Sequence, residues 1–406
     1  MFYGWWLVLV GLITQGLGAG GVIYAYSVLV LPLEHEFQTT RMAMMWGVTC
    51  SSLVAGLVSP WLGSLADRRP LHVLMAAGVV LMAAAFMVLS VTTAVWQVAL
   101  CYALFMSFAQ VLLGPLTAAT LITRWFSRRR GLALGLAAVG TGIGGLVVPP
   151  VLQALITAYE WRGACRWFAL LILAVALPPT LLVVSTPAEK GLRPDGEPGP
   201  PLPVAALAHG GAPMTTADIV RRFDFWAIAL AVGIVFADTG MLLSNMMPYA
   251  TGQGLPASAA VGLISTVAVA AVLGKLLFGA VADRIDLRFG LGAGMAVVCL
   301  ALALFRGGSS AGTLRAASFA LGLASGGILP LWGAMLGHAF GAEVYGRVIG
   351  LMSMAITVPV LLSPLLAGRI FDVTGAYLRV FEIFFVITLL VALLLPRLPP
   401  MRHGEG

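Results

Sequence analysis

Lys275 is the residue of this chain best suited by type and position to bind an anion. It is one of two lysines, and it lies inside a long apolar stretch. Placing an ammonium group in a lipid bilayer costs at least about 2.5 kcal/mol, so such groups usually face a wet cavity and mark a substrate path. The alternative is that the flexible four-carbon stem carries the charge to the membrane interface. In the first case, a single cation in a cleft suits a ligand with a single carboxylate.

Asp238 is the matching candidate for proton transfer. It lies in the middle of another apolar stretch, where an unpaired carboxylate tends to be protonated because apolar surroundings disfavour its charged form. It would either carry a proton or pair with Lys275. The alternative is a neutral acid that forms a hydrogen bond to a neighbouring helix.

Four other polar residues in apolar stretches are candidates for lining a substrate cavity. They are Gln15, Tyr24, Gln110 and Asn245. Each of these types, taken alone, is more often a contact between helices than a ligand contact.

A short motif that occurs twice has the composition expected of a gate. GSLADRR runs from Gly63 to Arg69, and GAVADRI runs from Gly279 to Ile285. Glycines let neighbouring helices approach closely, and aspartates can face a helix amino terminus or a guanidinium group. The predicted gating residues are Gly63, Asp67, Arg68, Gly279, Asp283 and Arg284. The alternative is that the arginines only anchor the chain at the membrane surface.

The elements that carry these residues are predicted to be transmembrane helices. Of the 406 residues, 60% are hydrophobic and 10% are charged, whereas a soluble domain carries about 25% charged residues. The apolar runs lack the alternation of a barrel strand, which leaves helices as the spanning element. About 20 apolar residues cross a bilayer. Twelve such stretches are present, at 5–31, 44–66, 71–91, 96–122, 131–158, 167–186, 225–250, 257–282, 289–305, 316–340, 348–368 and 380–396.

The chain is predicted to consist of two halves. Residues 187–222 are rich in proline, glycine and charge, which is typical of a flexible connector. We therefore expect a six-helix bundle over 1–186, a cytoplasmic linker over 187–222 and a second six-helix bundle over 223–406. Most basic residues fall in loops on the same side as this linker, which places both termini in the cytoplasm.

Other classes of function find little support in the sequence. The net charge of +7 is spread between apolar runs rather than clustered as on a nucleic-acid-binding face. The four cysteines show neither paired nor metal-ligand spacing, so we expect no metal and no cofactor. An enzyme would cluster a nucleophile and a base, which the five scattered histidines do not supply.

A run of glycines requires separate interpretation. Gly140, Gly142, Gly144 and Gly145 lie inside one apolar stretch, whereas a dinucleotide-binding loop requires a strand before it and a helix after it. We therefore expect close packing between helices at these glycines.

The repeated Gly-x-x-x-Asp-Arg motif resembles the signature loop of the major facilitator superfamily. A narrower resemblance lies in RWFSRRRGLALGLAAVGTGIGG, residues 124–145, which is similar to the monocarboxylate transporter family and its oxalate/formate-exchanger relatives. These transporters place a cation in the eighth span shortly before a glycine, where this chain has Lys275 and Gly279. The resemblance implies two bundles that rock about a central site. It also implies a monoanion, because the dicarboxylate exchangers carry a second cation in the eleventh span and this chain has none in its interior.

The chain departs from that family in one respect that concerns protons. The proton-coupled members carry an aspartate one turn before the eighth-span cation and a lysine in the first span. Here Ala271 occupies the first of these positions, and the first span has no lysine. The family's proton mechanism therefore does not carry over directly.

The sequence thus predicts an all-α membrane protein with twelve transmembrane helices in the major facilitator fold. Its expected function is secondary transport of a small organic anion. The leading substrate class is a monocarboxylate, and protons are the candidate coupling ion. We expect a monomer in the bacterial inner membrane, with no nucleic-acid partner. The alternatives are efflux of hydrophobic compounds, favoured if Lys275 reaches the interface, and a non-transporting membrane sensor on the same scaffold.

Overall fold

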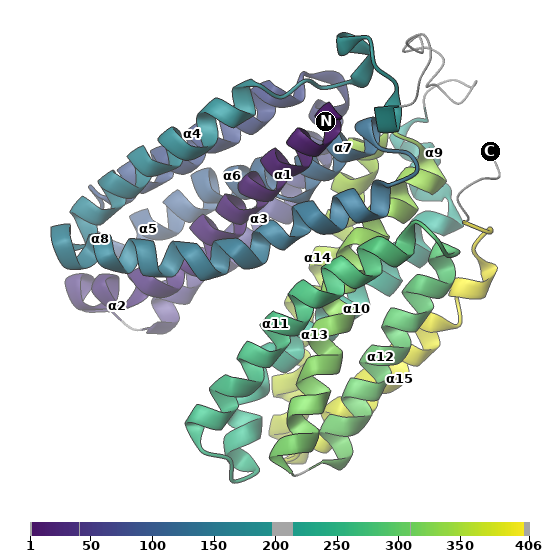
Figure 1. Cartoon of the computed structure of the whole chain (residues 1–406). Helices are drawn as coiled ribbons and strands as arrows, with labels where there is room; N and C mark the ends of the chain where they lie inside the picture. Colours follow the sequence, from purple (N-terminus) through teal and green to yellow (C-terminus); the bar gives the residue numbers. More distant parts are fainter. Residues whose placement is uncertain (1, 40, 197–213, 309, 402–406) are drawn as a thin grey trace. The chain divides into compact units, whose positions relative to one another are not determined.

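The computed structural model describes residues 2–39, 41–196, 214–308 and 310–401, and this part contains helices but no strands. Eleven of the described helices are long and apolar enough to cross a membrane. The chain separates into two compact units (Figure 1). The first comprises Met1–Pro213 with Phe340–Leu351, and the second comprises Met214–Ala339 with Met352–Gly406.

The first three predicted spans are continuous helical segments of the first unit. α1 (Tyr3–Ala19), the π-helical η1 (Gly20–Tyr24) and α2 (Ala25–Phe37) together form the first span. α3 (Arg41–Arg68) and α4 (Leu71–Leu89) form the second and third. The long apolar runs of the sequence therefore fix where these helices lie.

The fourth span is interrupted near its middle. α5 (Val95–Cys101), the π-helical η2 (Tyr102–Met106) and α6 (Ser107–Leu113) lead to Gly114, and α7 (Pro115–Trp125) begins directly after it. Pro115 has no N–H to donate to the carbonyl of Val111, one turn earlier, so the helical hydrogen bonding fails here. Gly114 takes an extended conformation at the break.

α8 (Arg130–Leu181) runs to the far end of the first unit and returns. Its 52 residues would span about 78 Å as one straight helix, more than twice the thickness of a bilayer core. Glu160 has a non-helical backbone, with φ of 58° and ψ of 171°, and Figure 1 shows that α8 turns back on itself. Asp195, beyond the end of α8, accepts hydrogen bonds from the backbone N–H groups of Ser127 and Arg128, before its start, at 2.8 and 2.7 Å. The total of twelve crossings stays a prediction.

Glycines allow α1 and α8 to pack backbone against backbone. A Cβ atom at Gly140 would overlap the carbonyl oxygen of Leu12, and a Cβ at Gly144 would overlap that of Gly16. The predicted helix packing of this glycine run is therefore confirmed.

The second unit is built from α10 (Phe223–Gly252), α11 (Ala257–Ala282), α12 (Leu287–Gly307), α13 (Ala311–Phe340), α14 (Tyr345–Thr374) and α15 (Tyr377–Ala392). The first turns of α14, as far as Leu351, belong to the first unit instead. Small residues again bring two helices together, here α11 and α13. A Cβ at Gly274 would overlap the carbonyl oxygen of Leu323, and a Cβ at Gly326 would overlap that of Ala271.

The described ends of the predicted linker are ordered, which the sequence analysis did not foresee. The 3-10 helices η3 (Pro187–Lys190) and η4 (Pro194–Gly196) follow α8. The helix α9 (Thr216–Arg221) precedes α10 and begins with a capping box between Thr215 and Asp218. Side-chain caps of this kind satisfy backbone groups that a structureless connector would leave to water. Residues 197–213 lie outside the described residues, and the predicted domain boundaries stay a prediction.

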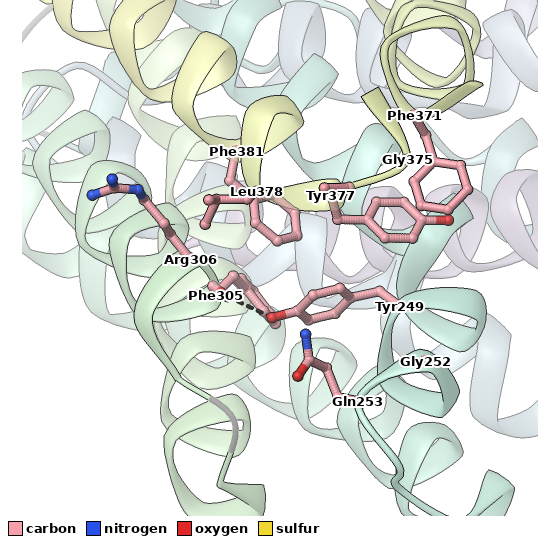
Figure 2. A pocket seen from close by; sticks show the side chains of 11 residues that line it. Tyr249, Gly252, Gln253, Phe305, Arg306, Phe371, Gly375, Tyr377, Leu378 and Phe381 are labelled. Carbon is pink, nitrogen blue, oxygen red and sulfur yellow. Dashed lines mark hydrogen bonds between the residues drawn. The ribbon is translucent and has the colours of Figure 1, made fainter. Parts of the chain in front are cut away.

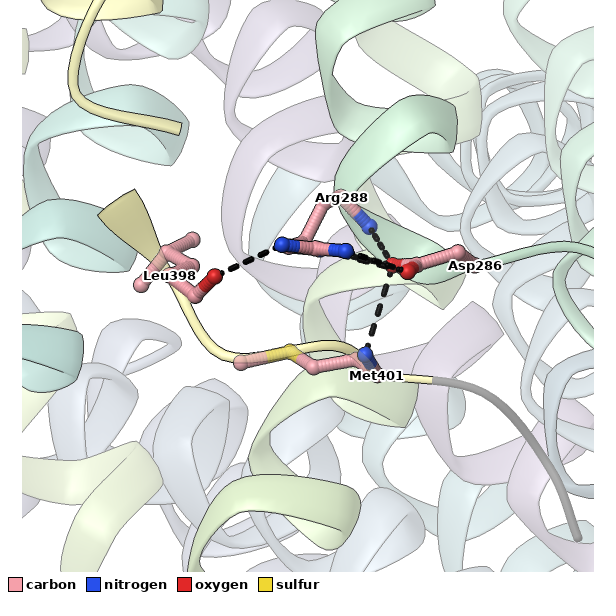
Figure 3. A network of polar contacts seen from close by, with 4 residues as sticks. All are labelled: Asp286, Arg288, Leu398 and Met401. Carbon is pink, nitrogen blue, oxygen red and sulfur yellow. Dashed lines mark hydrogen bonds and ion pairs between the residues drawn. The ribbon is translucent and has the colours of Figure 1, made fainter. Parts of the chain in front are cut away.

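The carboxyl-terminal segment is tied to the start of α12 (Figure 3). The Asp286 carboxylate accepts hydrogen bonds from the backbone N–H groups of Arg288, at 3.1 Å, and Met401, at 3.3 Å. The Arg288 guanidinium pairs with Asp286 at 2.8 Å and donates to the carbonyl of Leu398 at 2.8 Å. The Leu287 N–H donates to the carbonyl of Met401 at 3.1 Å. Charge and backbone bonds together therefore hold residues 398–401 against the turn between α11 and α12.

Candidate functional site

Lys275 lies on a buried face of α11. Its side chain is 9% exposed, whereas the nearby Leu273 and Leu277 are 46% and 52% exposed. The adjacent Gly274 packs against α13. Gly279, about one turn later, is also buried. Lys275 therefore leaves the helix away from the apolar surface that these leucines present.

Asp238 is fully buried in α10, where it contacts Thr388 of α15. The Thr388 hydroxyl oxygen lies 2.7 Å from Oδ2 of Asp238 and 2.9 Å from the carbonyl oxygen of Phe384. A hydroxyl group has one proton to donate, so it serves one of these two acceptors at a time. A protonated Asp238 would donate to Thr388 and leave the hydroxyl proton for Phe384.

The second oxygen of Asp238 also favours the protonated form of this side chain. Oδ1 is buried and has no hydrogen-bond partner among the residues that the structure describes. Burying an anionic oxygen without a hydrogen-bond partner costs much free energy, whereas burying a neutral carbonyl oxygen in the same way costs less. The geometry around Asp238 thus suits a carboxyl group that holds a proton.

Two of the predicted cavity residues are engaged with neighbouring residues of their own unit. The Asn245 amide donates to the carbonyl of Met241 at 2.9 Å, and its Oδ1 accepts from the Tyr377 hydroxyl of α15 at 3.4 Å. The ring of Tyr24 lies against Gly145 of α8, where any Cβ would clash with it. Tyr24 therefore packs two helices together, and Asn245 links α10 to α15.

The other two predicted cavity residues are glutamines near the break in the fourth span. Gln15 of α1 is 4% exposed, and Gln110 of α6 is half-buried. The Oε1 atoms of both are buried without a hydrogen-bond partner among the described residues. Gly18, about one turn after Gln15, lies against Gly114 at the break. These amides therefore keep hydrogen-bonding capacity that a polar ligand or a water could use.

Asp67, in the first copy of the repeated motif, binds the amino terminus of α14. Its two carboxylate oxygens accept hydrogen bonds from the N–H groups of Gly346, at 2.7 Å, and Arg347, at 2.8 Å. The partial positive charge of a helix amino terminus favours a carboxylate there. A Cβ at Gly63 would overlap the carbonyl oxygen of Gly346, so glycine is required for this approach. Arg124 of α7 donates to a backbone carbonyl of the same motif at 3.0 Å.

The remaining gating candidates are placed as follows. Arg68 and Arg284 are exposed, Gly279 is buried, and Asp283 ends α11 as its C-cap residue. The contacts of Asp67 lie inside the first compact unit, which includes the start of α14. A gating role for either copy of the motif stays a prediction.

The sequence analysis missed three residues of these arrangements. Thr388 is a polar residue in an otherwise apolar run, and this was a usable signal. Arg124 opens the run at residues 124–145 that carries the family resemblance, but its contact with the repeated motif was not predicted. Gly346 carries no signal in the sequence beyond its residue type.

Long apolar helices with close glycine contacts between them define a multi-pass integral membrane protein. This chain belongs to the Major Facilitator Superfamily, whose sequence profile matches residues 8–277 and 258–405. The fold agrees, because the fucose:proton symporter of E. coli superposes with a TM-score of 0.71 at 15% identity, covering 99% of this chain and 100% of that one.

Monocarboxylate transporters are among the relatives of this chain. Monocarboxylate transporter 11 of Homo sapiens is 26% identical over 92% of this chain and 78% of its own length. Monocarboxylate transporter 13 of Bos taurus is 25% identical over 94% of this chain and 86% of its own length. The Mus musculus transporter 11 is 31% identical, but the match spans 63% of this chain and little more than half, 56%, of that protein. The resemblance to the monocarboxylate branch is thereby confirmed.

Proposed function

We propose that this chain is a secondary transporter that carries a small monocarboxylate by alternating access of its two helical bundles. The observation that carries the proposal is the burial of Lys275 on an otherwise apolar helix. A buried ammonium group is costly to insert and is kept where it serves a substrate path. We expect the protein to act as a monomer in a plasma membrane, namely the bacterial inner membrane.

In this proposal Lys275 forms a charge-assisted hydrogen bond with the substrate carboxylate. A single carboxylate is favoured because α14 carries Arg347 in its first turn and Arg369 near its other end, with no cation between them. A dianion would bring a second charge into the membrane interior without a matching cation, and the desolvation cost would be large.

Asp238 is the proposed proton carrier. Its side chain already meets the Thr388 hydroxyl in a geometry that suits the protonated form. Release of the proton here would leave a buried anion. In this proposal the proton therefore leaves in the access state that hydrates the Asp238 side chain. Asp67 and the amino terminus of α14 form the proposed gate contact on one side.

The test is uptake of radiolabelled pyruvate and lactate into proteoliposomes, with and without an imposed proton gradient. We expect Lys275→Ala to lower kcat/KM about tenfold or more, since hydrogen bonds to charged groups contribute about 1.5–3 kcal/mol. Lys275→Arg should retain much of the activity because it keeps the charge. Lys190→Ala removes the other lysine, which is exposed, and should behave as wild type.

The same assay tests Asp238. Asp238→Asn preserves a neutral, hydrogen-bonding side chain, so exchange of substrate across the membrane should persist while proton-driven accumulation is lost. Saturable carboxylate uptake that is unchanged in Lys275→Ala would overturn the assignment of Lys275. Accumulation that is unchanged in Asp238→Asn would overturn the assignment of Asp238.

A further inference from the structure

A pocket opens at the end of the second unit where α10 and α14 end and α15 begins (Figure 2). Its cavity volume is about 350 Å³. Its lining includes five aromatic residues from four helices, here called the aromatic wall: Tyr249, Phe305, Phe371, Tyr377 and Phe381. It lies at the opposite end of α10 from α9 and at the opposite end of α15 from the carboxyl-terminal segment.

The aromatic wall is held in place by its own contacts. Tyr249 lies edge-on to Phe381 and Tyr377, with ring centroids 5.0 and 5.6 Å apart. Phe371 and Tyr377 lie 4.4 Å apart. The Tyr249 hydroxyl donates to the carbonyl of Phe305 (Figure 2). The rings of Phe371 and Tyr377 are half-buried and remain accessible, whereas Tyr249, Phe305 and Phe381 are almost fully covered. A ring entering this pocket would meet these two fixed rings in an offset or edge-on arrangement, as aromatic pairs prefer.

One charged residue, Arg306, stands at the rim of the pocket and belongs to a charge cluster beside it. The Glu382 carboxylate accepts from Arg306 at 2.9 Å and from Arg379 at 2.8 Å, so two guanidinium groups share one carboxylate. Arg306 lines the pocket and its side chain is 56% exposed. Gln253 is an exposed amide at the same rim. A guanidinium group at the rim disfavours the organic cations that aromatic cages otherwise bind and can pair with a carboxylate.

We propose that this pocket binds a small aromatic carboxylate, with the ring against the aromatic wall and the carboxylate toward Arg306. The volume lies within the range of about 300–1,000 Å³ that is typical of small-molecule sites. The site is separate from Lys275, and binding there requires neither transport nor a proton gradient. The predicted topology places it on the outer face of the membrane.

The test is isothermal titration calorimetry of the full chain, purified in detergent, with phenylacetate as the probe. Three analogues separate the contributions: cyclohexylacetate lacks the aromatic ring, 2-phenylethanol lacks the carboxylate, and phenyltrimethylammonium reverses the charge. We expect saturable binding of phenylacetate, with each analogue about tenfold weaker or worse, because ring and charge each contribute.

Variants then locate the site. Phe371→Leu removes a ring of the wall and Arg306→Gln removes the rim charge, and each should weaken phenylacetate binding about tenfold. Phe319→Leu makes the same change at an exposed phenylalanine of α13, outside the pocket, and should leave binding unchanged. Lys275→Ala should also leave it unchanged. All variants should elute from size-exclusion chromatography as wild type does.

Several outcomes would overturn the proposal. These are no saturable binding to wild type, equal binding of cyclohexylacetate, and no effect of either pocket variant. Loss of binding in Lys275→Ala would instead place the aromatic acid at the transport site. Failure of pyruvate uptake in proteoliposomes would leave this binding result intact, so the two proposals fail separately.

Discussion

Two kinds of aspartate side chain occur in this protein, and they differ in what their carboxyl groups contact. The Asp67 and Asp286 carboxylates each accept hydrogen bonds from two backbone N–H groups, so they fix the ends of helices and segments. Asp238 instead contacts one hydroxyl group and keeps one buried oxygen without a partner among the described residues. A carboxylate whose oxygens all accept hydrogen bonds stabilises the structure. A carboxyl group with one oxygen left without a hydrogen bond is suited to gain and lose a proton.

Asp286 should stabilise the second unit at neutral pH and lose this effect in acid. The hydrogen bond from the Arg288 guanidinium holds the pKa of Asp286 below its ordinary value. A carboxyl group with a lower pKa in the folded state stabilises that state above its unfolded pKa of about 3.9, and the effect disappears as the pH falls through the folded pKa. In melting curves between pH 7 and pH 3, Asp286→Asn should therefore melt below wild type at pH 7. The difference in melting temperature between the two proteins should stay constant down to about pH 4 and become smaller below it. A difference that grows in acid would contradict the assignment.

At the scale of helices, the sequence predicted where the spans lie better than how they are interrupted. Apolar runs mark the spans within a few residues, because the bilayer requires continuous apolar surface. The break at Gly114–Pro115 was visible in the sequence as a glycine followed by a proline, yet it was read as part of a continuous span. The π-helical segments η1 and η2 carry no comparable sequence signal. Packing against neighbours decides such segments, so they appear only in the structure.

Two glycine substitutions should separate helix propensity from helix packing. Gly368→Ala in α14 adds a methyl group where no atom lies within 4 Å, and alanine is favoured over glycine in a helix by about 1 kcal/mol. Gly140→Ala adds the same group where it would overlap the Leu12 carbonyl oxygen, and such overpacking typically costs about 1–3 kcal/mol. We expect Gly140→Ala to lower the melting temperature of the detergent-purified protein and Gly368→Ala to keep or raise it. Equal shifts in the same direction would show that close α1–α8 packing does not limit stability.

For the whole molecule, the sequence predicted the family and singled out two charged residues as site candidates, but it did not predict the partner of Asp238. Lys275 and Asp238 stand out because a charge in an apolar run is rare. Thr388 could not be assigned to Asp238, because the two residues are 150 positions apart and meet only when α10 and α15 pack together. Arg124 likewise reaches the motif of Asp67 from another span. Pattern therefore identifies the charged groups, and three-dimensional packing identifies the groups that tune them.

The number and direction of the crossings can be tested by labelling single cysteines with a membrane-impermeant maleimide. The four free cysteines, Cys50, Cys101, Cys165 and Cys299, are first replaced by alanine. New cysteines are then placed at Ser127, before α8, at Glu189, after it, and at Tyr159, beside its turn; all three positions are exposed. If α8 crosses twice and the amino terminus is cytoplasmic, Tyr159→Cys should react in intact cells. Ser127→Cys and Glu189→Cys should react only after permeabilisation, because the contact of Asp195 with the Ser127 N–H brings both ends of α8 together. If Ser127→Cys and Glu189→Cys are labelled from opposite sides of the membrane, α8 crosses it only once. If all three cysteines are labelled from the sides opposite to those expected, the termini lie outside the cell and the aromatic pocket lies on the cytoplasmic face.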